Sequence, residues 1–112
     1  MAFERFTEKG IRQTKDVSLT KEGQLIFSRR CSNQFGLCRY SYVDLYFDKD
    51  ETRIGVEGLS EGNTYSLRLR RYSKHGTYAV SLRAFCAFYK IDIAVTRRYD
   101  VMDIDNKIVI QL

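Results

Sequence analysis

The chain carries one pattern twice, and this repeat constrains its fold more than any other feature of the sequence. Residues 71–112 follow residues 17–57 at an offset of 53 to 55 positions, so only small insertions separate the copies. What recurs is a strand, a tight turn, a strand, a short helix, a strand, an acidic turn and a final strand. The matched positions include Gly23 with Gly76, Ser28 with Ser81, Asp48 with Asp103, Asp50 with Asp105 and Ile54 with Ile108. The repeat predicts one β-rich domain built from two similar halves.

Apolar periodicity predicts the elements within each half. Alternating apolar and polar residues at 17–20 are typical of a half-buried strand, and Gly23 supplies the turn that follows. Strands are also predicted at 52–57 and 64–72. The predicted helices are 29–35, which begins after the N-cap Ser28 and ends at Gly36, and 82–89, which begins after the N-cap Ser81. The apolar face of the second helix consists of Leu82, Phe85, Cys86 and Tyr89.

These elements predict a mainly β fold with two short helices. The two strand-turn-strand-helix-hairpin units are expected to form a compact, β-barrel-like pseudo-dimer. By size, residues 1–112 form a single domain. Its predicted parts are a lead-in segment at 1–16, a first repeat at 17–57, a connector at 58–63 and a second repeat at 64–112.

Composition narrows the class and compartment of the protein. No apolar run reaches the roughly 18 residues that a membrane span needs, so no membrane association is expected. The chain has three cysteines, and its N-terminal stretch lacks the apolar centre of a signal peptide. Together these features favour reduced thiols and a cytoplasmic location.

The residue types used in catalysis and metal binding are not suitably arranged. Cys31 and Cys38 are too widely spaced for a CxxC pair, and His75 is the sole histidine. The Asp-x-Asp sequences at 48–50 and 103–105 lack the glycine and terminal glutamate of a calcium loop and suit hairpin turns instead. The sequence contains no Walker loop, Rossmann fingerprint or HExxH motif. We therefore expect a protein that is not an enzyme and has no cofactor or metal.

Basic side chains are the strongest candidates for a functional site, since the formal net charge is +5. In the strand predicted at 64–72, leucines point to one face and arginines to the other. Arginine forks match the geometry of phosphate oxygens. The candidate nucleic-acid contacts are Arg68, Arg70, Arg71 and Lys74 on the strand and its turn, with Arg29, Arg30 and Arg83 on the helix side. The competing interpretation is a solvated strand face that charge keeps soluble.

The doubled pattern resembles the AbrB/MazE-like swapped-hairpin family. Residues 23–28 and 35–37 fit its glycine-led strand and helix end in the first copy, and 76–81 and 89–91 fit them in the second. Serine stands at 28 and 81 where the family has proline, and Lys90 stands where the family has glycine. The resemblance implies interlocked hairpins and DNA binding, with both copies supplied by a single chain.

Two function classes follow from these observations. The first is a small DNA-binding transcriptional regulator that contacts phosphates of double-stranded DNA through its arginine-rich strand. The second is a protein-interaction or assembly module, such as a small accessory protein of a virus or mobile element. The expected state is a monomeric pseudo-dimer or a homodimer.

Overall fold

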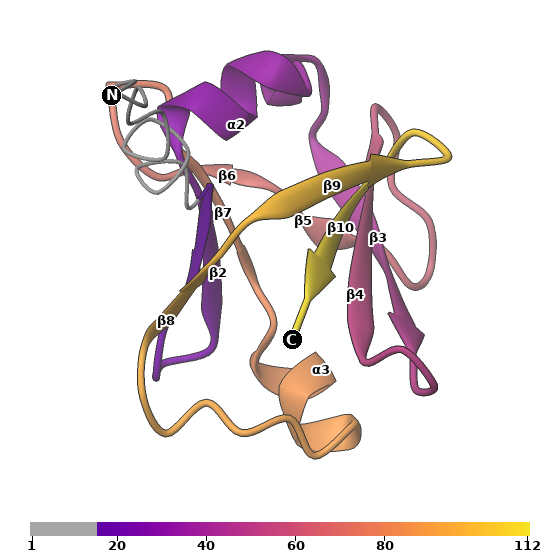
Figure 1. The fold of residues 1–112 in the computed structure, drawn as a ribbon. Coiled ribbons are helices and arrows are strands. Elements are labelled where there is room, and N and C mark those ends of the chain that lie inside the picture. Colours follow the sequence, from indigo (N-terminus) through magenta and orange to yellow (C-terminus); the bar gives the residue numbers. More distant parts are fainter. Residues whose placement is uncertain (1–15) are drawn as a thin grey trace, which may run out of the picture.

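The computed structural model describes residues 16–112 as two antiparallel sheets with two short helices (Figure 1). The first half contains β1 (Val17–Leu19), β2 (Gln24–Phe27), α2 (Arg29–Gln34), a 3-10 turn (Leu37–Arg39), β3 (Tyr42–Asp48) and β4 (Arg53–Leu59). The second half contains β5 (Leu67–Arg68), β6 (Arg70–Arg71), β7 (Tyr78–Ser81), α3 (Arg83–Phe88), β8 (Arg97–Tyr99), β9 (Val101–Ile104) and β10 (Lys107–Gln111). The predicted mainly β class with two short helices is confirmed. Apart from Asp16, the predicted lead-in segment lies outside the described residues.

Each sheet has five strands and contains strands from both halves of the chain. The first sheet has the order β6-β7-β2-β1-β8, and the second has the order β5-β3-β4-β10-β9. The two helices lie at opposite ends of the molecule (Figure 1). Because the strands divide into two separate sheets, the structure does not contain the closed barrel that a barrel-like prediction implies.

Besides the connection from β2 to β3 through α2, two short connections take the chain directly from a strand of one sheet to a strand of the other. β5 pairs with β3 in the second sheet, and β6 pairs with β7 in the first. The residue between them, Leu69, is 6% exposed, and its N–H donates to the carbonyl of Ser41 at 2.9 Å. The continuous strand predicted at 64–72 is therefore wrong, because burial of Leu69 bends the chain into a second pairing. β8 and β9 cross between the sheets in the same way, on either side of Asp100.

The core lies between the sheets and is built from alternate residues of their strands. Phe27 is its largest fully buried side chain, at 0% exposure. Its neighbour along β2, Ile26, is only half-buried because it points to the other face of the sheet. The fully or almost fully buried apolar residues of the strands include Val17, Leu19, Leu25, Phe27, Val43, Ile54, Val56, Val80, Ile108 and Ile110.

The two helices begin differently although they occupy corresponding places in the repeat and each follows a serine predicted as its cap. In α2, the Oγ of Ser28 accepts a hydrogen bond from the N–H of Cys31 at 3.1 Å, which confirms the predicted cap. In α3 the N-cap is Leu82 and no side chain caps it, so the cap predicted at Ser81 is wrong. Ser81 instead pairs with Gln24 as the last residue of β7.

Both helices end at a residue in the left-handed conformation. The predicted stop at Gly36 has φ of 61°, and Lys90 occupies the corresponding place after α3 with φ of 56°. Lys90 thus adopts the backbone conformation that glycine adopts after the first helix. Lysine in the second copy therefore stands where the first copy has glycine, and the backbone is left-handed at both positions.

The hairpin of β3 and β4 is longer than predicted. β4 runs to Leu59, two residues beyond the strand predicted at 52–57, because Gly58 and Leu59 pair with Val43 and Tyr42. This extension brings the segment that follows β4 to the side of β3.

Candidate functional site

An open groove of about 630 Å³ lies between the β3–β5 side of the second sheet and α3. It is called the aromatic groove here, after the rings among its lining residues. Those rings are Tyr46, Tyr65, Phe85, Phe88 and Tyr89. Tyr65 is 88% exposed and Phe88 is 77% exposed. Exposed apolar side chains beside a concave, mostly apolar hollow mark interaction and ligand sites, so this is the strongest candidate site in the described part of the chain.

Packed rings form the floor of the groove. Phe47 on β3 lies 4.6 Å from Tyr89 and 6.0 Å from Phe85, measured between ring centroids. Phe85 and Tyr89 lie 4.9 Å apart, and Phe88 lies 4.9 Å from Tyr89. Such edge and tilted contacts hold rings in defined positions. The apolar helix face predicted from the sequence is therefore the part of α3 that builds the floor and anchors it to the core.

Sequence periodicity did not identify Phe88 or Tyr65. Phe88 lies off the predicted inward face of α3, and Tyr65 lies in the segment before β5. A phenylalanine on the outward face of a short helix is the one sequence signal that could have drawn attention to this site.

A second hollow of about 370 Å³ continues the groove past Phe88 and Tyr89, which line both. Its charged lining consists of Lys49 and Lys90, and the Nζ of Lys49 lies 5.9 Å from the ring centroid of Tyr89. The charged residue lining the other hollow is Asp44. Asp44 and Lys49 are five positions apart along β3 and its turn, or about 16 Å in an extended chain. The joined groove is therefore acidic at one end and basic at the other.

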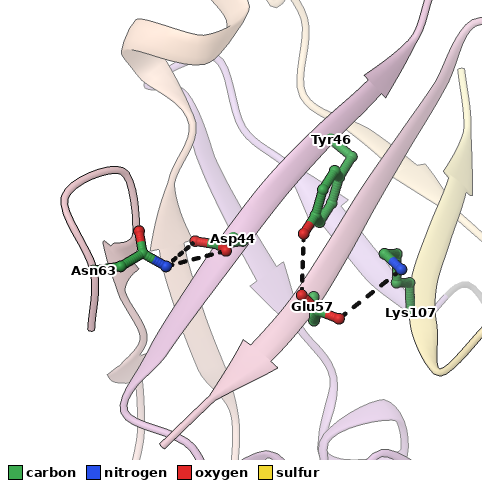
Figure 2. A network of polar contacts seen from close by, with 5 residues as sticks. All are labelled: Asp44, Tyr46, Glu57, Asn63 and Lys107. Carbon is green, nitrogen blue, oxygen red and sulfur yellow. Dashed lines mark hydrogen bonds and ion pairs between the residues drawn. The ribbon is translucent and has the colours of Figure 1, made fainter. Parts of the chain in front are cut away.

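Polar contacts organise the outer face of the second sheet beside the groove (Figure 2). The hydroxyl of Tyr46 donates to Oε1 of Glu57 at 3.0 Å, and this hydrogen bond raises the pKa of Tyr46. The Nζ of Lys107 lies 3.9 Å from Oε2 of Glu57 and 5.2 Å from the centroid of the Tyr46 ring. Tyr46 is thereby turned across β4 and away from the edge of the sheet.

Asp44 points the other way, towards the segment that follows β4 (Figure 2). The Nδ2 of Asn63 donates to both carboxylate oxygens of Asp44 at 3.2 Å. Asn63 also forms a tight turn, in which its Oδ1 accepts from the N–H of Tyr65 at 2.8 Å and its N–H donates to Oγ of Ser66 at 2.8 Å. This turn keeps the chain from continuing as a strand beside β3.

The consequence is an open edge on β3. β5 pairs with Tyr42 and Val43 alone, whereas β4 pairs with the whole of β3. Within residues 16–112, the stretch at 44–48 has a strand partner on one side only. The aromatic groove adjoins this edge, since residues 44–46 line it.

The predicted strand-side arginines lie on two consecutive strands that belong to different sheets, and Lys74 lies on the turn that follows. Arg68 is paired with Tyr42 in the second sheet, and Arg70 is paired with Ala79 in the first. Arg71 lies beside Arg70, and its guanidinium donates to the carbonyls of Ser73 and Lys74 at 3.3 and 3.4 Å. These three arginines and Lys74 are all exposed.

The helix-side residues divide between the two ends of the β2–β7 pair. Arg29 lies beside the turn that carries Lys74, since a Cβ built at Gly76 would be 3.6 Å from its Cγ. Arg83 lies beside the other turn, where a Cβ built at Gly23 would be 2.9 Å from its Cα. β2 and β7 are antiparallel, so these turns are at opposite ends. The seven predicted residues therefore do not all lie together.

Arg30 lies in a different electrostatic setting from the other predicted residues. Burial raises the pKa of Asp16, the charge of Arg30 opposes this rise, and Asp100 adds to it. Arg30 is thus close enough to Asp16 for part of its charge to be balanced within the chain.

Two of the three thiols are buried. Cys31 and Cys86 are buried, as predicted for Cys86, and Cys38 is exposed. Burial, with Asp16 nearby, raises the pKa of Cys31 to about 12, so its thiolate is scarce at neutral pH. Among the residues at 16–112, no three His, Cys, Asp or Glu side chains are grouped to hold a metal ion.

Comparison with known proteins adds no assignment to these surfaces. No family model matches the chain, and no curated protein or solved structure matches it. In the part of the chain that the structure describes, no helix combines the length and apolar character needed to cross a bilayer.

Proposed function

We propose that the protein is a non-enzymatic protein-interaction module whose partner binds in the aromatic groove. The observation that carries this proposal is the exposure of Tyr65 and Phe88, at 88% and 77%, on either side of an apolar hollow. Aromatic residues are enriched at protein interfaces, and a few such side chains in a concave site supply much of the binding energy.

The proposal includes an internal pseudo-dimer, in which each half of the chain acts as one subunit. Its support is the register of the strands that join the halves. Ile26 pairs with Ala79, its counterpart 53 positions later, and Gly55 pairs with Val109, its counterpart 54 positions later. A twofold axis that relates two equal halves passes through pairs of this kind. A chain built in this way already contains its own dimerisation partner.

The groove is tested with a random dodecapeptide library displayed on phage. Clones enriched on the wild-type protein are expected to bind the Phe88→Ser variant at least tenfold more weakly, because a central aromatic contact is lost. The matched control is Tyr72→Ser, which removes a ring that is 55% exposed and does not line the groove. This variant should bind the same clones as the wild type does. Clones that bind regardless of Phe88, or no enriched clones at all, would refute the proposal.

Double-stranded DNA is the second candidate partner, as for a small transcriptional regulator. The observation that favours it is the run of exposed cationic residues on β5, β6 and the following turn, namely Arg68, Arg70, Arg71 and Lys74. Binding of labelled duplex DNA should weaken steeply with salt, and the double variant Arg68→Glu, Arg70→Glu should reduce the log–log slope by about 2. An unchanged affinity and slope in this variant would exclude these arginines as phosphate contacts.

A further inference from the structure

We propose that the segment bound in the groove is an extended one, which adds to the second sheet as a sixth strand along the open edge of β3. This inference rests on the proposed function and specifies the chemistry of the partner. An acidic residue leads the segment, apolar residues alternate along it, and a basic residue ends it.

The first argument is the state of the β3 edge. At 44–48 the backbone has β4 on one side and, among the described residues, no strand on the other. Unpaired N–H and C=O groups of an edge strand are a template for a further strand. β5 already occupies the same edge at Tyr42 and Val43 in antiparallel orientation. A bound segment would continue the line that β5 begins.

The second argument is the apolar hollow directly beside that edge. Leu45 lines the groove with Phe85, and Phe47 packs on Phe85 and Tyr89. An added strand would present every second side chain to this same face. Those side chains would enter the hollow between β3 and α3, and the exposed ring of Phe88 would cover them. The groove therefore selects apolar residues at alternate positions rather than at helical spacing.

The third argument is charge complementarity along the edge. Asp44 lies at the β5 end, and its carboxylate points towards Asn63 rather than towards β4 (Figure 2). Lys49 and Lys90 lie at the far end. An antiparallel segment begins beside the lysines and ends beside the carboxylate. It is therefore matched by an acidic residue at its start and a basic residue at its end.

The first experiment uses the peptides enriched from the phage library, synthesised and labelled for fluorescence anisotropy. They are expected to show apolar residues at every second position. N-methylation of every second backbone amide should weaken binding at least tenfold when it blocks the N–H groups that face β3. It should have little effect when it blocks the N–H groups that face away from β3. Strand addition would be overturned if the peptides had apolar residues spaced by three and four positions and tolerated N-methylation of either set of amides. That result would leave the aromatic groove as the binding site, so the two proposals fail separately.

The second experiment exchanges the charges at the two ends of the groove. The variant Asp44→Lys, Lys49→Glu, Lys90→Glu is compared with the wild type on two peptides of the same composition, one with the acidic residue first and one with the basic residue first. The wild type should favour the acid-first peptide by about fivefold, and the variant should favour the other. Circular dichroism is the check that the variant folds. An unchanged preference would refute the orientation. Dimerisation of the wild type that Phe88→Ser abolishes would assign the edge to a second copy and overturn the proposal.

Discussion

Replacement of Gly23 by alanine is expected to lower the free energy of unfolding by about 3 kcal/mol, on two combined grounds. The first is conformation, since Gly23 has φ of 84°, which L side chains rarely adopt. The second is space, since the new Cβ would lie 2.9 Å from Cα of Arg83. The chain cannot easily move apart here, because the N–H of Leu82 donates to the carbonyl of Gly23 at 2.7 Å.

The matched control is Gly76→Ala. Gly76 has nearly the same backbone angle, with φ of 86°, but its new Cβ would lie 3.6 Å from Cγ of Arg29. That distance is an ordinary contact with a flexible side chain, so only the conformational cost of about 1 kcal/mol remains. Urea denaturation followed by circular dichroism measures both variants. Equal losses would show that the contact of Gly23 with α3 does not limit substitution.

The second large effect is expected at Phe27. Truncation to alanine should cost about 4 kcal/mol, because a fully buried ring is removed and the surrounding strands can collapse only in part. This is a large share of the roughly 5–15 kcal/mol that stabilises a typical domain.

Ile26 provides the control for Phe27, because it is the preceding residue on the same strand and points to the opposite face. Ile26→Ala is expected to cost about 2 kcal/mol, since its side chain is only partly buried and leaves no closed cavity in the core. Thermal and urea unfolding of both variants checks the difference. Similar losses at 26 and 27 would contradict the placement of the core on one face of the first sheet.

The sequence predicted local chemistry better than tertiary pairing. Gly23, Gly36 and Gly76 were expected at turns or helix ends, and all three have positive φ. The Ser28 cap was also predicted and is present. These features depend on neighbours within a few residues, so the sequence pattern contains the information that determines them.

The incorrect predictions concern contacts between segments that are distant in sequence. Ser81 has the same local signal as Ser28, but it pairs with β2 instead of capping α3. Leu69 fits a strand pattern, but its burial between two sheets breaks that strand. Alternation shows that a residue faces inward without showing which sheet it faces.

The candidate site was less predictable than the fold. Arginines are visible in any sequence, and the strand-side set is exposed as expected. The groove depends on how the turn at Asn63 leaves the edge of β3 open and on where α3 packs. Neither the turn geometry nor the position of the helix has a periodic signal. Phe88 therefore gains its significance only from its neighbours in space.

The pairing of β4 with β10 has a consequence for synthesis of the protein. It joins residues 53–56 with 108–111, so β4 lacks this neighbour until more than fifty further residues have been made. At translation rates of about 5–20 residues per second, the wait is roughly 3 to 10 s. Throughout that interval the nascent hairpin of β3 and β4 has an exposed edge that other chains can join. The β3–β4 hairpin is thus open to aggregation while the chain is still being made on the ribosome.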